Sequence, residues 1–283
     1  MLGAIIGDMV GSPYEFNAGA KPKKEDIKLF GEGNKMTDDS YLTLAVGKVL
    51  MRHYPFDLTA SFKEAIPREL KEEFKKAVLA HPYAGFGASF QKWASLPYEE
   101  MAPYNSCANG SAMRVSSLGW LCSSLSEVKE LSLIVSEITH NHPDGIKGAE
   151  AIAACVYLAR NSFSKEQIRD YVELNYYPSI RSLDYEDLVR NYAFDVFCEN
   201  SCPQAIYCFL QSESLEDAII KAVCIGGDSD TIASMVGAIA EAFYSKNGLS
   251  ELERRYMDGV LDKETIEPIK KMHRLINSPK FAS

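Results

Sequence analysis

Two short acidic stretches stand at the start of apolar segments near opposite ends of the chain. "TDDS" (residues 37–40) precedes one apolar segment, and "GGDSDT" (residues 226–231) precedes another. Their carboxylates and threonine hydroxyls are hard oxygen ligands, which suit Mg²⁺, Mn²⁺ or Ca²⁺ better than Zn²⁺. Helix capping is the alternative, because Asp and Thr are common at helix N-termini and acids there interact favourably with the helix dipole.

Each acidic stretch holds more acids than one helix cap needs. A carboxylate that is buried without a partner is costly, and neighbouring carboxylates raise one another's pKa. A divalent cation removes this penalty and lowers the pKa of a bound water molecule. The two stretches together therefore predict a metal site that activates a nucleophile.

Two stretches rich in small residues, "HPYAGFGASFQKW" (residues 81–93) and "NSCANGSAMR" (residues 105–114), open onto expected helices. Backbone amides in such loops can bind an anion, and Phe86 with its aromatic neighbours could stack on a base or ribose. Simple turns are the alternative, since glycine in a loop most often only makes a turn. His140 and His142 in "THNHP" do not share a helical face, so a histidine here is more typical of a dipole partner than of a metal ligand.

The elements that must position these residues are predicted to be helices. Apolar residues recur at intervals of three and four, period-two alternation is nearly absent, and an all-α fold is therefore expected. The periodic segments are residues 41–50, 118–133, 146–158, 218–225 and 232–243. Ser126, Ser164 and Ser214 precede helical runs, and "SKEQ" from Ser164 fits a capping box. "YYPSI" (residues 176–180) is the best strand-like segment.

Glycines near the start of the chain predict a close contact between helices. Gly3, Gly7 and Gly11 are four residues apart, so in a helix they form one bare stripe against which another backbone can press. Glycine is a poor helix former, and close packing would compensate for that cost.

The composition narrows the class of protein. The 283 residues include 30 Lys and Arg against 39 Asp and Glu, a net charge of −9, so a nucleic-acid grip through phosphate neutralisation is not expected. The prolines do not cluster into a linker and no repeat is present, which predicts one domain over residues 1–283. The apolar N-terminal segment meets Asp8 early and lacks a basic leader, so neither a signal peptide nor a membrane span is expected.

The seven cysteines are odd in number and form no CxxC pair. They are interpreted as reduced thiols of a cytoplasmic protein, with a zinc site at Cys198 and Cys202 as the alternative.

Five motifs in order, "GDMVGSPYE", "TDDS", "NGSAMR", "TH" and "GGDSDT", resemble those of the ADP-ribosylglycohydrolase family. The resemblance spans nearly the whole chain, and the region from "FDVFCENSCPQAI" onward is most similar to the bacterial branch. It implies a compact orthogonal bundle of helices around a cleft that holds two Mg²⁺ ions, with Mn²⁺ as an alternative. It also implies the substrate, which is ADP-ribose attached to an arginine or serine side chain or to a small acceptor.

The resemblance also assigns roles to residues of this chain. The implied metal ligands are Thr37, Asp38, Asp39, Asp228, Asp230 and Thr231. The implied catalytic residues are Glu15, Asp38, Asp39 and Asp228, with the aspartates as candidates for water activation and Glu15 as acid or positioning residue. The expected substrate-binding residues are Gly85, Phe86, Gly87, Ser106, Cys107, Asn109, Gly110 and His140.

Two other functions remain open at this level. A helical isoprenoid diphosphate enzyme also binds Mg²⁺ through aspartates on facing helices, but its first motif needs a further acid where this chain has Leu42 and Thr43. A member of the same family that binds ADP-ribose without cleaving it, or serves a structural role, is the second alternative. A monomer suffices for a single deep cleft.

Overall fold

The computed structural model describes residues 1–16 and 21–277, which form fourteen α-helices and no β-strand. The first seven are α1 (Leu2–Gly11), α2 (Asp38–Arg52), α3 (Ala60–Ala80), α4 (Ala88–Ser95), α5 (Ser116–Leu121), α6 (Leu125–Ser136) and α7 (Pro143–Arg160). The others are α8 (Lys165–Asn175), α9 (Tyr185–Asn191), α10 (Cys198–Leu210), α11 (Leu215–Ile225), α12 (Ser229–Tyr244), α13 (Glu251–Gly259) and α14 (Lys263–Ile276). The predicted all-α fold is confirmed.

The centre of the bundle is the contact between α1 and α12, whose residues are almost all buried. A β-carbon placed on Gly3 would lie 2.3 Å from the carbonyl oxygen of Gly237, and one on Gly7 would lie 2.0 Å from that of Ala233. One on Gly11 would lie 2.5 Å from the carbonyl oxygen of Ser229, at the start of α12. The predicted glycine stripe is therefore confirmed, and it brings the two backbones into direct contact.

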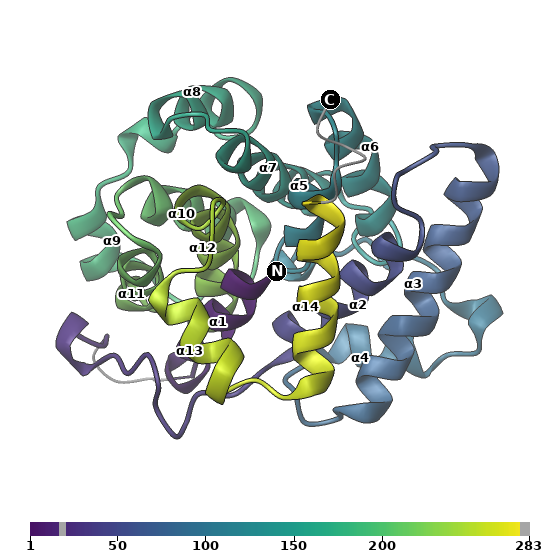
Figure 1. Ribbon diagram of the computed structural model, residues 1–283, viewed down its shortest axis with the longest axis horizontal. Helices are drawn as coiled ribbons and strands as arrows, with labels where there is room; N and C mark the ends of the chain where they lie inside the picture. Colours follow the sequence, from purple (N-terminus) through teal and green to yellow (C-terminus); the bar gives the residue numbers. More distant parts are fainter. Residues whose placement is uncertain (17–20, 278–283) are drawn as a thin grey trace.

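The other helices surround this pair. Figure 1 shows α2, α3 and α14 on one side of the molecule, α8 to α11 on the other, and α5, α6 and α7 crossing above. The large apolar side chains of these helices form one continuous core. Helices from the beginning, middle and end of the chain therefore share one interior.

Local signals account for some helix boundaries and fail at others. The capping box at Ser164 is present, since its hydroxyl accepts from the amide of Gln167, whose side chain accepts in return from the Ser164 amide. The segment predicted as one helix over residues 118–133 is two, because α5 ends before Cys122, whose backbone is extended, and Ser124, rather than Ser126, caps α6.

The segment 176–180, expected to be the most strand-like, instead follows the end of α8 and leads into a 3₁₀ turn. Among the described residues the only strand-like pairing is an isolated bridge between Ala108 and Phe197. Residues 176–180 have no neighbouring strand among the described residues with which to pair. Tyr177 and Ile180 are buried in the helical core instead.

The seven cysteines are free thiols, and all but Cys107 are buried. Cys198 donates its thiol hydrogen to the carbonyl of Ala108, and Cys202 contacts the sulfur of Met235. Among the described residues, neither cluster of potential metal ligands includes a cysteine, so the zinc alternative finds no support.

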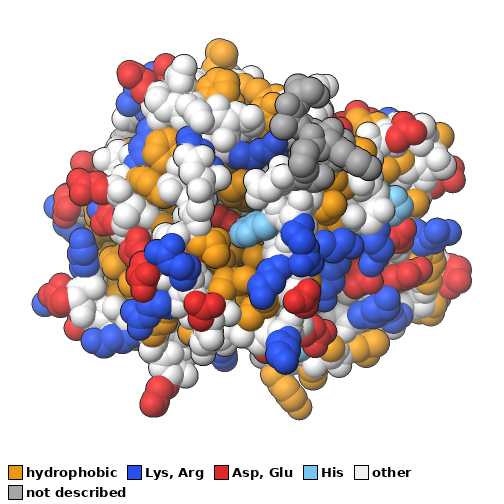
Figure 2. All heavy atoms as spheres, viewed as in Figure 1, with side chains coloured by type: hydrophobic (Ala, Val, Ile, Leu, Met, Phe, Trp, Pro, Cys, Tyr) orange, Lys and Arg blue, Asp and Glu red, His pale blue; other side chains and the backbone are white. Residues whose placement is uncertain are grey.

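No helix in the described ranges combines the length and apolarity needed to cross a membrane. On the face shown in Figure 2, basic and acidic side chains are interspersed around a central hollow.

Candidate active site and metal centre

Buried carboxylates from three helices meet where α1, α2 and α12 converge. Oxygen atoms of Asp8, Asp39 and Asp230 lie within 4.8 Å of one another, and those of Glu15, Asp228 and Asp230 form a second group of the same size. Asp230 belongs to both groups. The two groups of oxygen atoms that could hold a cation therefore share one carboxylate.

Asp8 belongs to this carboxylate cluster, although it was not predicted as a site residue. It lies on α1 and is completely buried. Its carboxylate accepts from the amide and the hydroxyl of Thr37, at 2.9 and 2.7 Å, and from the amide of Ser40 at 3.1 Å and the Ser40 hydroxyl. Asp8 therefore holds the first turn of α2 in place as well as contributing an oxygen to the cluster.

Asp39 is placed by hydroxyls from both acidic stretches. The hydroxyl of Thr231 donates to its Oδ2 at 3.2 Å, which joins the start of α2 to the first turn of α12, and the hydroxyl oxygen of Thr37 lies 3.3 Å from the same atom. Its other oxygen, Oδ1, is buried and has no hydrogen-bond partner among the described residues. A buried carboxylate oxygen without a donor fits a cation, and an all-oxygen set fits Mg²⁺ or Mn²⁺.

The electrostatics of the cluster favour a bound cation. Burial, followed by repulsion from neighbouring carboxylates, raises the pKa of Asp38, Asp39 and Asp230 well above the ordinary range. Burial also raises the pKa of Asp8 to about 6, and burial together with Asp228 raises that of Glu15 to about 7. A divalent cation would offset both effects, because it attracts the charged form of every acid in the cluster.

These carboxylates, except that of the completely buried Asp8, line one part of a cleft of about 490 Å³, which we call its floor. Its lining contains thirteen of the residues predicted as ligands, catalytic residues or substrate contacts: Glu15, Asp38, Asp39, Gly85, Gly87, Ser106, Cys107, Asn109, Gly110, His140, Asp228, Asp230 and Thr231. Asn109 joins the wall to the floor, since its side-chain amide donates to Asp228 Oδ2 at 2.7 Å. Thr37 lies behind this lining, where its hydroxyl bonds Asp8 and Asp39.

Phe86 does not lie on the wall of the cleft, where it was expected to contact substrate. Its side chain is buried and stacks on Phe90, with ring centroids 5.8 Å apart, and it does not line the cleft. From this loop and the start of α4, the residues that line the cleft are Gly85, Gly87, Ala88, Ser89 and Phe90. The expectation that Phe86 contacts substrate is corrected: the ring anchors the loop to the core.

The lining also includes residues that were not predicted as site residues, among them Tyr104, Arg114, Val196 and Phe197. Arg114 was visible as the last residue of "NGSAMR", and Tyr104 as an aromatic residue beside the second loop. The other two lie about ninety residues away from that loop in the sequence, where the backbone of Val196 accepts from the amide of Asn109 at 2.7 Å. No local pattern could have indicated their position.

Two glycines form the tight turn that directly precedes Asp228. Gly226 and Gly227 both have positive φ, +71° and +79°, which side-chain-bearing residues rarely adopt. A β-carbon on Gly227 would also lie 2.7 Å from the ring of Tyr192. The backbone therefore turns tightly between α11 and α12 and delivers Asp228 to the cleft.

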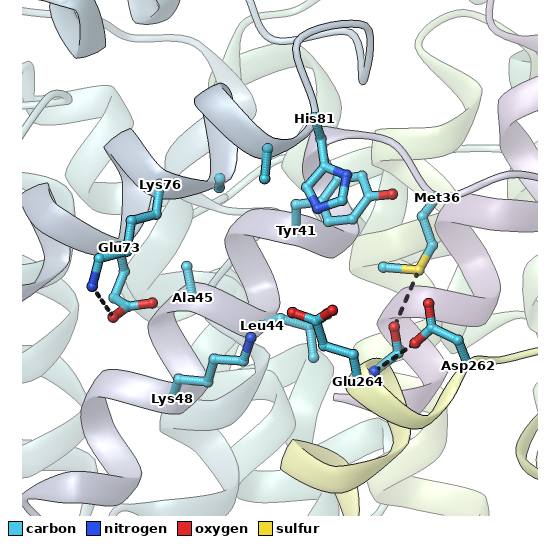
Figure 3. Close-up of a pocket in the computed structure, with 13 residues that line it drawn as sticks. Met36, Tyr41, Leu44, Ala45, Lys48, Glu73, Lys76, His81, Asp262 and Glu264 are labelled. Carbon is cyan, nitrogen blue, oxygen red and sulfur yellow. Dashed lines mark hydrogen bonds and ion pairs between the residues drawn. The ribbon is translucent and has the colours of Figure 1, made fainter.

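A second hollow, of about 230 Å³, lies on another face of α2, between α3 and the start of α14 (Figure 3). Tyr41 and His81 stack across one end of it, with ring centroids 3.7 Å apart. Its charged groups have both signs, and Lys76 is paired with Glu73 at 3.2 Å. It is about half the size of the carboxylate cleft and includes neither of the two acid groups.

Comparison with known sequences identifies the class of protein to which this helical bundle and its buried acidic cluster belong. The ADP-ribosylglycohydrolase family profile matches residues 1–280, and the chain belongs to this family of glycosyl-bond hydrolases.

Among individual proteins, the chain is similar to the ADP-ribosylhydrolase ARH3 of Homo sapiens, at 26% identity over 97% of this chain and 92% of that protein. It is also similar to the ADP-ribosylarginine hydrolase Tri1 of Pseudomonas putida, at 23% identity over 88% of this chain and 70% of that protein. A solved structure titled "ADP-ribosylglycohydrolase-related protein complex" shares the fold, with a TM-score of 0.68 at 18% identity, covering 97% of both chains.

Proposed function

We propose that this protein hydrolyses the glycosidic bond between ADP-ribose and an arginine or serine side chain, or a small ADP-ribosylated acceptor, in a reaction that depends on two Mg²⁺ ions. The observation that carries the proposal is the pair of carboxylate groups sharing Asp230 at the floor of a cleft. Membership of the family, and relatives named for hydrolysis of ADP-ribosyl bonds, support the choice of substrate.

The metal would be held by Asp8, Asp39 and Asp230 at one position and by Glu15, Asp228 and Asp230 at the other, with the Thr37 and Thr231 hydroxyls beside them. Asp38 lines the cleft as well. Bound Mg²⁺ would neutralise these acids, orient the ribose diol and lower the pKa of an attacking water. Mn²⁺ can take the same oxygen ligands.

The residues of the chain supply the rest of the mechanism. Cleavage at the anomeric carbon proceeds through an oxocarbenium-like transition state, which a nearby carboxylate stabilises and a second group assists by protonating the leaving group. Asp38, Asp39 and Asp228 are the candidates to receive the proton of the water. Glu15, which lines the cleft directly after the turn that follows α1, is the candidate to position the leaving group, or to protonate it where Glu15 does not bind the second cation.

The small-residue loop would bind the phosphates of ADP-ribose. Its backbone amides face an anion most readily where no side chain intervenes, as at Gly110. Ser106, Cys107, Asn109 and His140 line the same wall.

Incubation with ADP-ribosylated serine and arginine peptides, with Mg²⁺ and with EDTA, tests the proposal. We expect release of ADP-ribose from at least one peptide with Mg²⁺ and none with EDTA. Asp39→Asn and Asp228→Asn should each lose turnover at saturating Mg²⁺, and full turnover by either variant would contradict the metal-centred mechanism. Binding of ADP-ribose without release from any substrate would instead support the non-catalytic alternative.

Four properties remain predictions: a single domain over residues 1–283, membership of the bacterial branch, the monomeric state and the cytoplasmic location. The rates of ADP-ribose release from the serine and arginine peptides will show which of the two linkages the protein prefers.

A further inference from the structure

Arg114 is a completely buried cation beside the proposed cleft. Its Nη2 donates to the hydroxyl of Thr139 at 3.0 Å and to the carbonyl of Val135 at 3.3 Å, and its guanidinium lies 4.7 Å from the centre of the Phe74 ring. Among the described residues no carboxylate forms an ion pair with it, and its Nε and Nη1 have no hydrogen-bond partner. Burying a cation without an ion-pair partner is costly, so the position of Arg114 beside the cleft calls for an explanation.

The Thr139 hydroxyl connects this guanidinium to His140. Its oxygen lies 3.0 Å from Arg114 Nη2 and 2.7 Å from His140 Nδ1, and both residues that it joins line the cleft. A guanidinium can only donate, so the Thr139 oxygen must be the acceptor in the first of these contacts. The hydroxyl proton is then directed to the other contact, where Nδ1 accepts it.

The reverse arrangement does not satisfy the same groups. If His140 carried its proton on Nδ1 and donated to Thr139, the hydroxyl oxygen would accept twice and its own proton would have no acceptor among the described residues. Leaving a donor unpaired at a completely buried threonine is costly, so this arrangement is disfavoured. A neutral imidazole carries one proton, so acceptance at Nδ1 places that proton on Nε2.

The surroundings favour a neutral ring. His140 is buried, and burial, followed by the charge of Arg114, lowers its pKa well below the ordinary value of 6.5. The ring of Tyr104 is the neighbouring aromatic group, with its centroid 6.2 Å away. In the described chain Nε2 makes no hydrogen bond, and it lies 3.3 Å from the point where a β-carbon on Gly110 would stand.

We propose that Arg114 and Thr139 are positioning residues that hold His140 as the neutral Nε2–H tautomer, so that it offers a hydrogen-bond donor to an acceptor atom of the ligand in the cleft. The tautomer follows from the geometry of the free protein. Only the identity of the ligand, ADP-ribose, rests on the proposed function.

Nitrogen-15 NMR of the free protein with labelled histidine tests the tautomer. The chain has five histidines, so the resonances of His140 are assigned by their loss in His140→Gln. We expect an unprotonated Nδ1 and a protonated Nε2 in the wild type. Thr139→Ser should preserve this pattern because it keeps the hydroxyl, whereas Thr139→Val should give a mixture of the two tautomers.

Binding of ADP-ribose, measured by calorimetry, tests the role of that donor. Thr139→Val should weaken binding about tenfold, the effect of losing one well-oriented hydrogen bond, and Thr139→Ser should restore it. Thr265→Val is the matched control, because its buried hydroxyl contacts the sulfur of Met36 and the carboxylate of Asp262 and lies outside the cleft. It should bind ADP-ribose like the wild type.

A proton on Nδ1 in the wild type, or an unchanged tautomer in Thr139→Val, would overturn the proposal. Equal ADP-ribose affinity in Thr139→Val and Thr139→Ser would overturn the donor role. If the wild type binds no ADP-ribose at all, the proposed function fails, while the NMR pattern of the free protein still decides the tautomer.

Discussion

Asp8, the aspartate of the "GDMVGSPYE" motif, illustrates how one side chain that was not predicted as a site residue can organise a site. It accepts hydrogen bonds from two residues of the first turn of α2 and also contributes an oxygen to one of the two carboxylate groups. Groups that orient metal ligands affect metal affinity almost as strongly as the ligands themselves. Asp8 therefore links the position of Thr37 and Ser40 to the proposed cation.

Asp8→Asn should lower the affinity for Mg²⁺ by about 10- to 100-fold. The amide keeps the shape of the side chain, but it replaces one accepting oxygen with a donor that faces the donors of Thr37 and Ser40. Calorimetric titration with Mn²⁺ or Mg²⁺ measures the change. Asp26→Asn, an exposed substitution in a surface turn, is the control, and equal affinity in the two variants would exclude the assigned role of Asp8.

The raised pKa values of the cluster predict how stability depends on pH without metal. Because Glu15 and the buried aspartates hold protons more tightly in the folded than in the unfolded chain, the folded state binds more protons above pH 4. The free energy of unfolding should therefore fall between pH 6.5 and 8, by up to about 1.4 kcal/mol per pH unit for each proton retained.

Urea unfolding in EDTA at these two pH values measures this slope. The buried His140 acts in the opposite direction, but only below its ordinary pKa of 6.5, so it contributes little in this window. Saturating Mg²⁺ should reduce or reverse the slope, because it binds the deprotonated cluster. A metal-free protein that gains stability from pH 6.5 to 8 would contradict this account.

At the scale of elements, the glycine stripe of α1 determines where the acids meet. Because Gly7 and Gly11 lie against the backbone at Ala233 and Ser229, α1 runs along the first turns of α12. Asp8 is thereby brought beside Asp230, although 222 residues separate them in the chain. Helix α2 adds Asp38 and Asp39 through its first turn, and Tyr41 and Leu44 on another face line the second hollow.

Gly7→Ala should destabilise the protein by about 1–3 kcal/mol, because the new β-carbon would lie 2.0 Å from a backbone oxygen that cannot move alone. The displacement of α1 should also weaken Mg²⁺ binding. Chemical denaturation with a parallel metal titration measures both effects. Gly259→Ala is the control, since nothing lies within 4 Å of its β-carbon position, and it should change stability by no more than about 0.5 kcal/mol.

At the scale of the whole molecule, the proposed cations would connect three helices that are distant in sequence. Their ligands come from α1 and the turn after it, from α2 and from the start of α12. A ligand that binds only the folded state stabilises it in proportion to the logarithm of its concentration over Kd. Metal binding should therefore stabilise the complete fold rather than one loop.

Mg²⁺ at one hundred times its Kd should stabilise the protein by about 2.7 kcal/mol relative to EDTA. Thermal denaturation over a series of Mg²⁺ concentrations measures the increment as a rise in Tm. Asp230→Asn should lose most of this rise, because Asp230 belongs to both carboxylate groups. A wild-type Tm that is the same in Mg²⁺ and EDTA would argue against a metal site in this cluster.

The sequence by itself determined the features that depend on local spacing. The apolar period of three to four marks a helix wherever it occurs, and Ser164 with Gln167 forms its capping box within one turn. The surplus acids at residues 37–40 and 226–231 indicated a cation because burial of so many carboxylates is costly without one. Even the stripe of Gly3, Gly7 and Gly11 predicted a close contact, without identifying the partner.

Only the tertiary structure decided which residues complete the site. Asp8 was an acid in an apolar helix until α1 packed against α2 and α12, and Phe86 was an aromatic loop residue until its ring stacked on Phe90 in the core. The relay from Arg114 through Thr139 to His140 joins residues from two separate segments. Hydrogen bonds and burial depend on distances in space, and a local sequence pattern does not specify contacts between residues that lie far apart in the chain.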